Sequence, residues 1–206
     1  RPSVRRVLLI GLGGGTIPKQ IVNYYPDTTI DVVEIDPVVV DVAKKYFAVQ
    51  PSERLRIHVG DGRIFLQRSQ EKWDLILVDA YTTNRYGDTI PPHLVTREFF
   101  AQVAQHLSDG GVLHYHCVFS GSRLLVALQK TVADVFPSSY VTRGEILASR
   151  VALLTTKEKA LERAKNTRAG SLPNLAAYLD EMQPYAAAGA DVPLLTDDYA
   201  PVDTLR

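Results

Sequence analysis

The sequence lacks the features of secreted, membrane-spanning and nucleic-acid-binding proteins. Its 206 residues contain one cysteine, Cys117, which excludes an intramolecular disulfide and favours a reducing, cytoplasmic compartment. No apolar run approaches the ~20 residues that are needed to span a bilayer. Lys and Arg together number 23, as do Asp and Glu, so the formal net charge is zero, and no long basic run occurs. We therefore expect no membrane contact by this segment and no general affinity for nucleic acid.

The sequence has no internal repeat or low-complexity tract, and we expect no signal peptide in this segment. It begins with Arg1 rather than methionine, and an expected strand follows almost at once. We interpret this abrupt start as the mark of a piece of a longer chain. Hydrophobic residues make up 46% and charged residues 22% of the sequence, which is ordinary for a folded protein. We expect residues 1–206 to form a single nucleotide-binding, transferase-like domain.

Short apolar runs alternate with helical patterns along the chain, which is typical of an α/β protein with a parallel sheet. The run Val7-Leu8-Leu9-Ile10 suits a strand that is covered on both faces. The alternation predicts a Rossmann-like, seven-stranded, mostly parallel sheet with helices on both faces and an antiparallel strand near the edge. Strands are expected at residues 7–10, 30–35, 55–59, 75–78, 112–118, 139–142 and 148–155.

Helices are expected between these strands, with two more near the C-terminal end. Asp36, which precedes Pro37, and Thr96 are typical N-cap residues. A polar loop without periodicity runs from Ala80 to Pro92, and its length favours a functional role. The expected helices lie near residues 16–24, 38–47, 96–106, 122–135, 157–165 and 174–184, with a short one after residue 62.

A glycine-rich turn connects the first expected strand to the first helix. Gly11, Gly13 and Gly15 give the spacing Gly-x-Gly-x-Gly, followed by Thr16. Glycines allow positive φ angles and close approach of a ligand, and the helix N-terminus offers free N–H groups. A dinucleotide fingerprint requires Gly-x-Gly-x-x-Gly or Ala, and the turn departs from it at Thr16. The spacing favours a site for an S-adenosylmethionine-type nucleotide over a dinucleotide site or a simple tight turn.

Acidic residues stand at the ends of the next three expected strands. Glu34 lies 19 residues after Gly15, where a carboxylate can accept both hydrogen bonds of a ribose diol, and we assign it no structural duty. Asp61, beside Gly62, can accept a hydrogen bond from adenine, cap the following helix, or do both. Asp79 ends the fourth strand. Because open α/β sheets bind ligands at the carboxyl ends of their strands, we expect these residues to line one nucleotide site.

This set of residues resembles a known family. The segment from Val7 to Tyr81 is similar to the core of spermidine and spermine synthases, the aminopropyltransferases built on the class I methyltransferase fold. By resemblance, Glu34 would hold the ribose, Asp61 the adenine, and the glycine turn the methionine-derived part of S-adenosylmethionine or its decarboxylated form. The similarity covers about residues 5–135, and it rests on Glu34-Ile35-Asp36, Val59-Gly60-Asp61-Gly62, the Asp79 strand end and, more loosely, residues 96–100 and 110–113.

The sequence departs from that family at two positions. Spermidine synthases carry an aspartate in the glycine turn that holds the aminopropyl ammonium group, and here this position is Gly14. They carry a second aspartate, which deprotonates the attacking amine, where this chain has Thr82. Both changes remove charge that would bind a cationic acceptor and accept its proton. The catalytic candidates that remain are Asp79 and, in the polar loop, Tyr81 and Asp88.

The sequence His114-Tyr115-His116 places two imidazoles on one face of the fifth expected strand. Metal sites need several ligands at suitable spacing, and no carboxylate or cysteine stands at ligand spacing beside this pair. We therefore expect no metal site there. Cys117, the next residue, is interpreted as a small buried side chain of the same strand.

Three functions remain open. The first is an aminopropyltransferase that uses decarboxylated S-adenosylmethionine and an amine acceptor. The second is a methyltransferase that uses S-adenosylmethionine itself, since Gly14 leaves room for a carboxylate that an acid would repel. The third is a non-catalytic nucleotide-binding domain. The expected partner is a small-molecule amine or another small acceptor, and a homodimer is left open.

Overall fold

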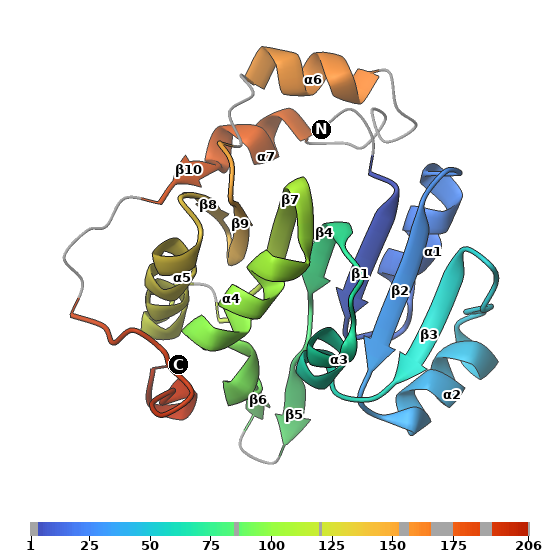
Figure 1. The fold of residues 1–206 in the computed structure, drawn as a ribbon, viewed down its shortest axis with the longest axis horizontal. Helices are drawn as coiled ribbons and strands as arrows, with labels where there is room; N and C mark the ends of the chain where they lie inside the picture. Colours follow the sequence, from blue (N-terminus) through green and yellow to red (C-terminus); the bar gives the residue numbers. More distant parts are fainter. Residues whose placement is uncertain are drawn as a thin grey trace.

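The computed structural model describes residues 4–84, 87–119, 121–152, 157–165, 175–185 and 191–205. Its centre is an eight-stranded sheet with helices on both faces (Figure 1). The strands of this sheet are β1 (Arg6–Ile10), β2 (Thr29–Glu34), β3 (Leu55–Val59), β4 (Trp73–Val78), β7 (Leu107–His116), β8 (Ser138–Thr142), β9 (Glu145–Ser149) and β10 (Gln183–Pro184). Their order is β10-β8-β9-β7-β4-β1-β2-β3.

The first five of these strands in the chain, β1 to β4 and β7, pair in parallel, whereas β9, β8 and β10 are joined by antiparallel pairs. This arrangement confirms the predicted mostly parallel α/β fold with an antiparallel edge. The sheet has eight strands rather than seven because the two-residue β10 pairs with Tyr140 and Val141 of β8. So short a strand carries no periodic pattern, and the sequence gives no sign of it.

The helices alternate with the strands. Asp36 and Thr96 cap α2 and α4, as predicted, by accepting hydrogen bonds from the amides of Val38 and Phe99. In the described part of the chain, no helix has the length and apolar character that crossing a membrane requires. The helices are α1 (Thr16–Tyr24), α2 (Pro37–Tyr46), α3 (Gly62–Arg68), α4 (Arg97–His106), α5 (Arg123–Val135), α6 (Lys157–Lys165) and α7 (Leu175–Glu181).

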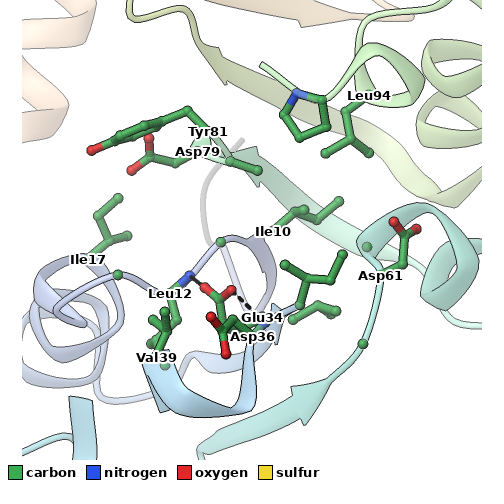
Figure 2. A pocket seen from close by; sticks show the side chains of 18 of the residues that line it. Ile10, Leu12, Ile17, Glu34, Asp36, Val39, Asp61, Asp79, Tyr81 and Leu94 are labelled. Carbon is green, nitrogen blue, oxygen red and sulfur yellow. Dashed lines mark hydrogen bonds between the residues drawn. The ribbon is translucent and has the colours of Figure 1, made fainter. Parts of the chain in front are cut away.

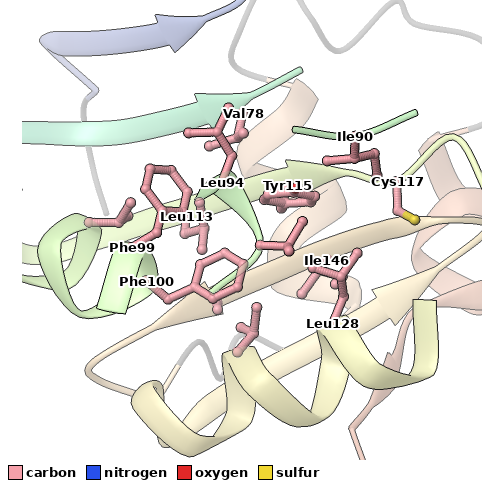
Figure 3. Close-up of a cluster of buried hydrophobic side chains, with 14 of the residues drawn as sticks. Val78, Ile90, Leu94, Phe99, Phe100, Leu113, Tyr115, Cys117, Leu128 and Ile146 are labelled. Atoms are coloured by element: carbon pink, nitrogen blue, oxygen red, sulfur yellow. The ribbon is translucent and has the colours of Figure 1, made fainter. Parts of the chain in front are cut away.

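Two hydrophobic cores lie on opposite faces of the sheet. Alternate side chains of β1 enter different cores: Leu8 enters the larger one and Leu9 the smaller one. Figure 3 shows part of the larger core, where the ring of Phe100 from α4 packs edge-on against the buried ring of Tyr115 from β7, with 5.6 Å between the ring centroids. Because β1 and β2 are covered on both faces, their buried residues form a continuous run, as the sequence of β1 predicts.

The antiparallel edge starts earlier than expected. Strand β9 spans Glu145–Ser149 instead of residues 148–155, of which residues 153–155 lie outside the described part. Arg143 and Gly144 have φ angles of 38° and 94° and form the tight turn between β8 and β9. Two-residue hairpin turns of this kind need positive φ at both central positions. The pair Asn-Gly is the usual sequence signal for such a turn, and Arg-Gly is a weaker one. The turn places Glu145 at the start of β9.

The segment from Ala80 to Pro92, predicted as a loop without periodicity, contains two short strands. It contains an antiparallel hairpin of β5 (Thr82–Asn84) and β6 (Gly87–Thr89), at the lower edge of the molecule in Figure 1. Ile90 and Leu94 on its C-terminal side are buried in the larger core. These two anchors hold the return segment of the loop against the sheet, and residues 91–94 stay close to the ends of the central strands.

Candidate functional site: a pocket at the strand ends

A pocket of about 650 Å³ opens at the carboxyl ends of β1, β2, β3 and β4. This is within the ~300–1,000 Å³ that is usual for small-molecule sites. It brings together every predicted site residue except Asp88, whose side chain lies outside the described part of the chain. The pocket is lined by residues 10–17, 33–36, 39, 60–62, 79–81, 91, 93 and 94.

The glycine turn has little space for side chains. A Cβ atom at Gly11 would lie 2.1 Å from the carbonyl oxygen of Asp79, and one at Gly15 would lie 2.2 Å from Val49 Cγ2. At Gly13, which has φ +51°, a Cβ would meet nothing within 4 Å. Gly11 and Gly15 therefore let the turn pack closely against Asp79, at the end of β4, and against Val49, and Gly13 leaves open space at the pocket wall. No side chain caps the N-terminus of α1, so its free N–H groups suit a polar ligand.

Glu34 is a structural residue as well as a pocket residue. Its Oε2 accepts a hydrogen bond from the backbone N–H of Leu12 at 2.9 Å, and its Oε1 accepts one from the N–H of Asp36 at 3.0 Å (Figure 2). The expectation that Glu34 has no structural duty is therefore wrong. A carboxylate has about four lone-pair sites, so two hydrogen bonds leave capacity for a ligand.

Asp61 takes the capping role that its position allowed, and its second oxygen has a partner in the pocket. Its Oδ1 caps α3 by accepting a hydrogen bond from the N–H of Ile64 at 2.9 Å. Its Oδ2 lies 2.8 Å from Nε2 of His93, which also lines the pocket. Sequence reasoning missed His93, because no local pattern links it to a residue 32 positions earlier.

A C-terminal segment supports the wall of the pocket that contains Asp61 and His93. Arg63, in the first turn of α3, donates hydrogen bonds to both carboxylate oxygens of Asp197, at 2.7 and 2.6 Å. The same guanidinium donates to the carbonyl oxygen of His93 at 3.1 Å. The hydrogen bonds between the partners raise the pKa of Arg63 and lower the pKa of Asp197. The segment around Asp197 thus holds the backbone of His93 in place.

Asp79 and Tyr81 form the opposite wall of the pocket (Figure 2). Oδ1 of Asp79 lies 2.8 Å from Nδ1 of His116, at the end of β7. Sequence reasoning placed His114 and His116 on one face of the strand but did not connect them to Asp79. Among the described residues, no group of three or more His, Cys, Asp or Glu side chains could hold a metal ion.

Comparisons with known proteins identify relatives of this chain. Residues 1–162 match the spermine/spermidine synthase domain family. The chain is 35% identical to the polyamine aminopropyltransferase of Vibrio vulnificus, over the whole chain and 71% of that protein. It is 32% identical to the eEF1A lysine and N-terminal methyltransferase of Bos taurus, over 68% of this chain and 21% of that protein.

The fold has a solved counterpart. The crystal structure of human methyltransferase-like protein 13 in complex with SAH has a TM-score of 0.66 and 25% sequence identity, and it covers 98% of this chain and 89% of that one. The fold is therefore methyltransferase-like, as the resemblance implied. The family match extends from the glycine turn past all four strand ends that line the pocket. The chain belongs to the spermine/spermidine synthase family.

Proposed function

We propose that this chain transfers an aminopropyl group from decarboxylated S-adenosylmethionine to a small primary amine. The observation that carries the proposal is the convergence of Glu34, Asp61 and Asp79 on one pocket, in a chain of the spermine/spermidine synthase family. In such a transfer, the nitrogen of a neutral amine attacks the carbon beside the sulfonium. The protein then has to align donor and acceptor and to remove a proton from the amine.

The walls of the pocket suit the parts of the nucleotide. The remaining lone pairs of Glu34 would accept hydrogen bonds from the ribose hydroxyls, and Asp61 would bind the adenine amine. The turn from Gly11 to Gly15 would contact the methionine-derived part, with Gly62 leaving room beside the base. A Cβ at Gly62 would lie 2.4 Å from Ile10 Cγ2, so this position accepts no side chain without movement.

The acceptor would enter beside Asp79 and Tyr81. Asp79 offers a carboxylate to an ammonium group, and the half-exposed ring of Tyr81 offers a face to a cationic or apolar chain. Asp88 belongs to the hairpin that follows these residues. We assign the acceptor side to these three residues.

A second candidate is methyl transfer from S-adenosylmethionine. Gly14 lines the pocket and carries no charge, whereas an acid at this position would repel the methionine carboxylate. A Cβ at Gly14 would meet only the ring of Phe47, at 3.5 Å. The similarity to the eEF1A methyltransferase over 68% of this chain supports the same candidate.

The nucleotide and the product separate these candidates. Calorimetry on the full-length protein would compare S-adenosylmethionine with its decarboxylated form. Mass spectrometry would follow transfer to α,ω-diamines and a triamine. The proposal expects tighter binding of the decarboxylated form, together with an aminopropylated amine and 5′-methylthioadenosine. Production of S-adenosylhomocysteine would establish the methyltransferase, and tight binding without turnover of either nucleotide would point to a non-catalytic domain.

A further inference from the structure

Carboxylate and imidazole groups alternate in a line that leads away from the pocket. The line begins at Asp79, whose Oδ1 lies 2.8 Å from His116 Nδ1. On the other side of the ring, His116 Nε2 lies 3.8 Å from Oε1 of Glu145. Oε2 of Glu145 lies 2.8 Å from His114 Nε2, at ion-pair distance but without hydrogen-bond geometry.

The strand register fixes this line. The parallel pairing of β4 and β7 places Val78 opposite Tyr115, so the next residues along, Asp79 and His116, are neighbours. The antiparallel pairing of β7 and β9 places His116 opposite Glu145. Since side chains alternate along a strand, Tyr115 enters the larger core while His116 faces the other side. Two backbone ladders across three strands, rather than flexible loops, therefore hold the groups together.

Partial burial strengthens the electrostatic interactions between the groups of this line. The side chains of Asp79, His116 and Glu145 are 30%, 35% and 23% exposed, so solvent screens their interaction only in part. Two further titratable groups are influenced by the same charge. Burial raises the pKa of Tyr178 in α7 and of Cys117, which directly follows β7, and the negative charge of Glu145 raises both further.

We propose that His116 takes up, through Asp79, the proton that the amine acceptor loses during transfer. This inference rests on the proposed aminopropyl transfer. The acceptor ammonium gives one proton to the carboxylate of Asp79, which passes a proton from Oδ1 to Nδ1 of His116. The neutral amine then forms its bond to the carbon beside the sulfonium, the carbon–sulfur bond breaks, and its electron pair goes to sulfur. The product amine stays protonated, and the imidazolium later releases its proton to water.

This relay adds an imidazole as a second proton acceptor behind the carboxylate. An ordinary carboxylate has a pKa of about 4 and an alkylamine one of about 10, whereas an ordinary imidazole titrates near 6.5. An imidazole is therefore a better reservoir for the proton at neutral pH. The resulting imidazolium would lie between two carboxylates, those of Asp79 and Glu145. Thr82, three residues after Asp79, cannot accept this proton at neutral pH, whereas Asp79 and its partner His116 can.

His116 is thus a positioning residue that acts through Asp79, and a pH profile tests this role. In the His116→Asn variant, the amide can still donate a hydrogen bond to Asp79 but cannot titrate. We expect its kcat for transfer from decarboxylated S-adenosylmethionine to 1,4-diaminobutane to fall at least about tenfold, with nucleotide affinity unchanged. The rise of kcat with pH near neutrality should disappear. Glu145→Gln removes a negative charge that lies 3.8 Å from the ring and favours the imidazolium, so that rise should move to lower pH.

The matched control is His58→Asn, since His58 of β3 pairs with Asp31 of β2, outside the pocket. This variant should keep the wild-type pH profile. If the wild type transfers the group and His116→Asn retains its profile, the inference is wrong and the proposed function stands. If the wild type transfers no aminopropyl group to any amine, both are overturned. If His116→Asn does not fold, Glu145→Gln decides, because an unshifted profile in that variant contradicts the relay.

Discussion

Glu34 accepts a hydrogen bond from the backbone N–H of Leu12 at 2.9 Å, which ties the end of β2 to the glycine turn after β1. Its second oxygen binds the N–H of Asp36 at the start of α2. The side chain is only 9% exposed, so these bonds lie in a weakly screened environment. One carboxylate thus shapes two walls of the pocket while lining it, and nucleotide binding and stability should be coupled at this position.

Glu34→Ala should therefore have two effects. It leaves two backbone N–H groups without their acceptor, and we expect a loss of about 1–3 kcal/mol in the free energy of unfolding. It also removes the proposed ribose contact, and affinity for an adenosine nucleotide should fall by about 1.5–3 kcal/mol. Chemical denaturation and calorimetry of the folded variant measure the two effects separately.

Asp36→Ala provides the control for this prediction. Asp36 caps α2 through the N–H of Val38, and losing this cap should cost about 0.5–2 kcal/mol of stability. Nucleotide affinity should change much less than in Glu34→Ala. Equal losses of affinity in both variants would mean that the local shape of the turn, rather than a ribose contact, governs binding.

The local patterns of the sequence predicted the pocket, but not what supports it. A strand end followed by glycine or an acid is visible within a few residues, and Glu34, Asp61 and Asp79 do converge on the pocket. The supporting pairs join residues far apart in the chain: 134 residues separate Arg63 from Asp197. Such pairs depend on the order of strands and on tertiary packing, which the spacing of residues along the chain does not contain.

Arg63→Lys tests whether the C-terminal segment supports the pocket. Lysine cannot make the two parallel hydrogen bonds to Asp197 and still reach the carbonyl of His93. We expect nucleotide affinity to fall about threefold to tenfold, with a stability loss of about 1 kcal/mol. Calorimetric titration with the nucleotide checks this. Arg97→Lys is the matched control: its partner Asp134 is also a single aspartate but stands away from the pocket, so affinity should stay at the wild-type value.

Asp31 should make stability depend on acid pH. Burial raises its pKa, but hydrogen bonds from Trp73 and His58 and the charge of Arg56 outweigh this, so the pKa lies below its ordinary value of 3.8. A carboxyl whose pKa is lower in the folded state stabilises it above the ordinary pKa, and this contribution is lost as the pH falls through the folded-state value.

Asp31→Asn should accordingly cost about 1–3 kcal/mol at pH 7, and the difference from the wild type should shrink below about pH 4. Urea unfolding at pH 7, 5 and 3.5 measures this difference. Taking the difference between the two proteins cancels the titration of all other carboxyl groups. A difference that stays constant across this range would show that charge at Asp31 contributes nothing to stability.

Substitution by alanine should mainly lower stability at Gly11 and mainly lower nucleotide affinity at Gly13. In Gly11→Ala, the new methyl carbon would lie 2.1 Å from the carbonyl oxygen of Asp79, at a φ of +100°, so β1 and β4 would have to separate. We expect a destabilisation of about 3 kcal/mol or more.

In Gly13→Ala, the methyl group meets nothing within 4 Å, and only the positive φ is unfavourable, at about 1–2 kcal/mol. The methyl would occupy space at the pocket wall, and nucleotide affinity should fall at least about tenfold in a protein that remains folded. Thermal unfolding and calorimetry of the two variants check both halves. Wild-type affinity in Gly13→Ala would show that the ligand does not approach the turn closely, and the glycine turn would then serve only its own packing against Asp79 and Val49.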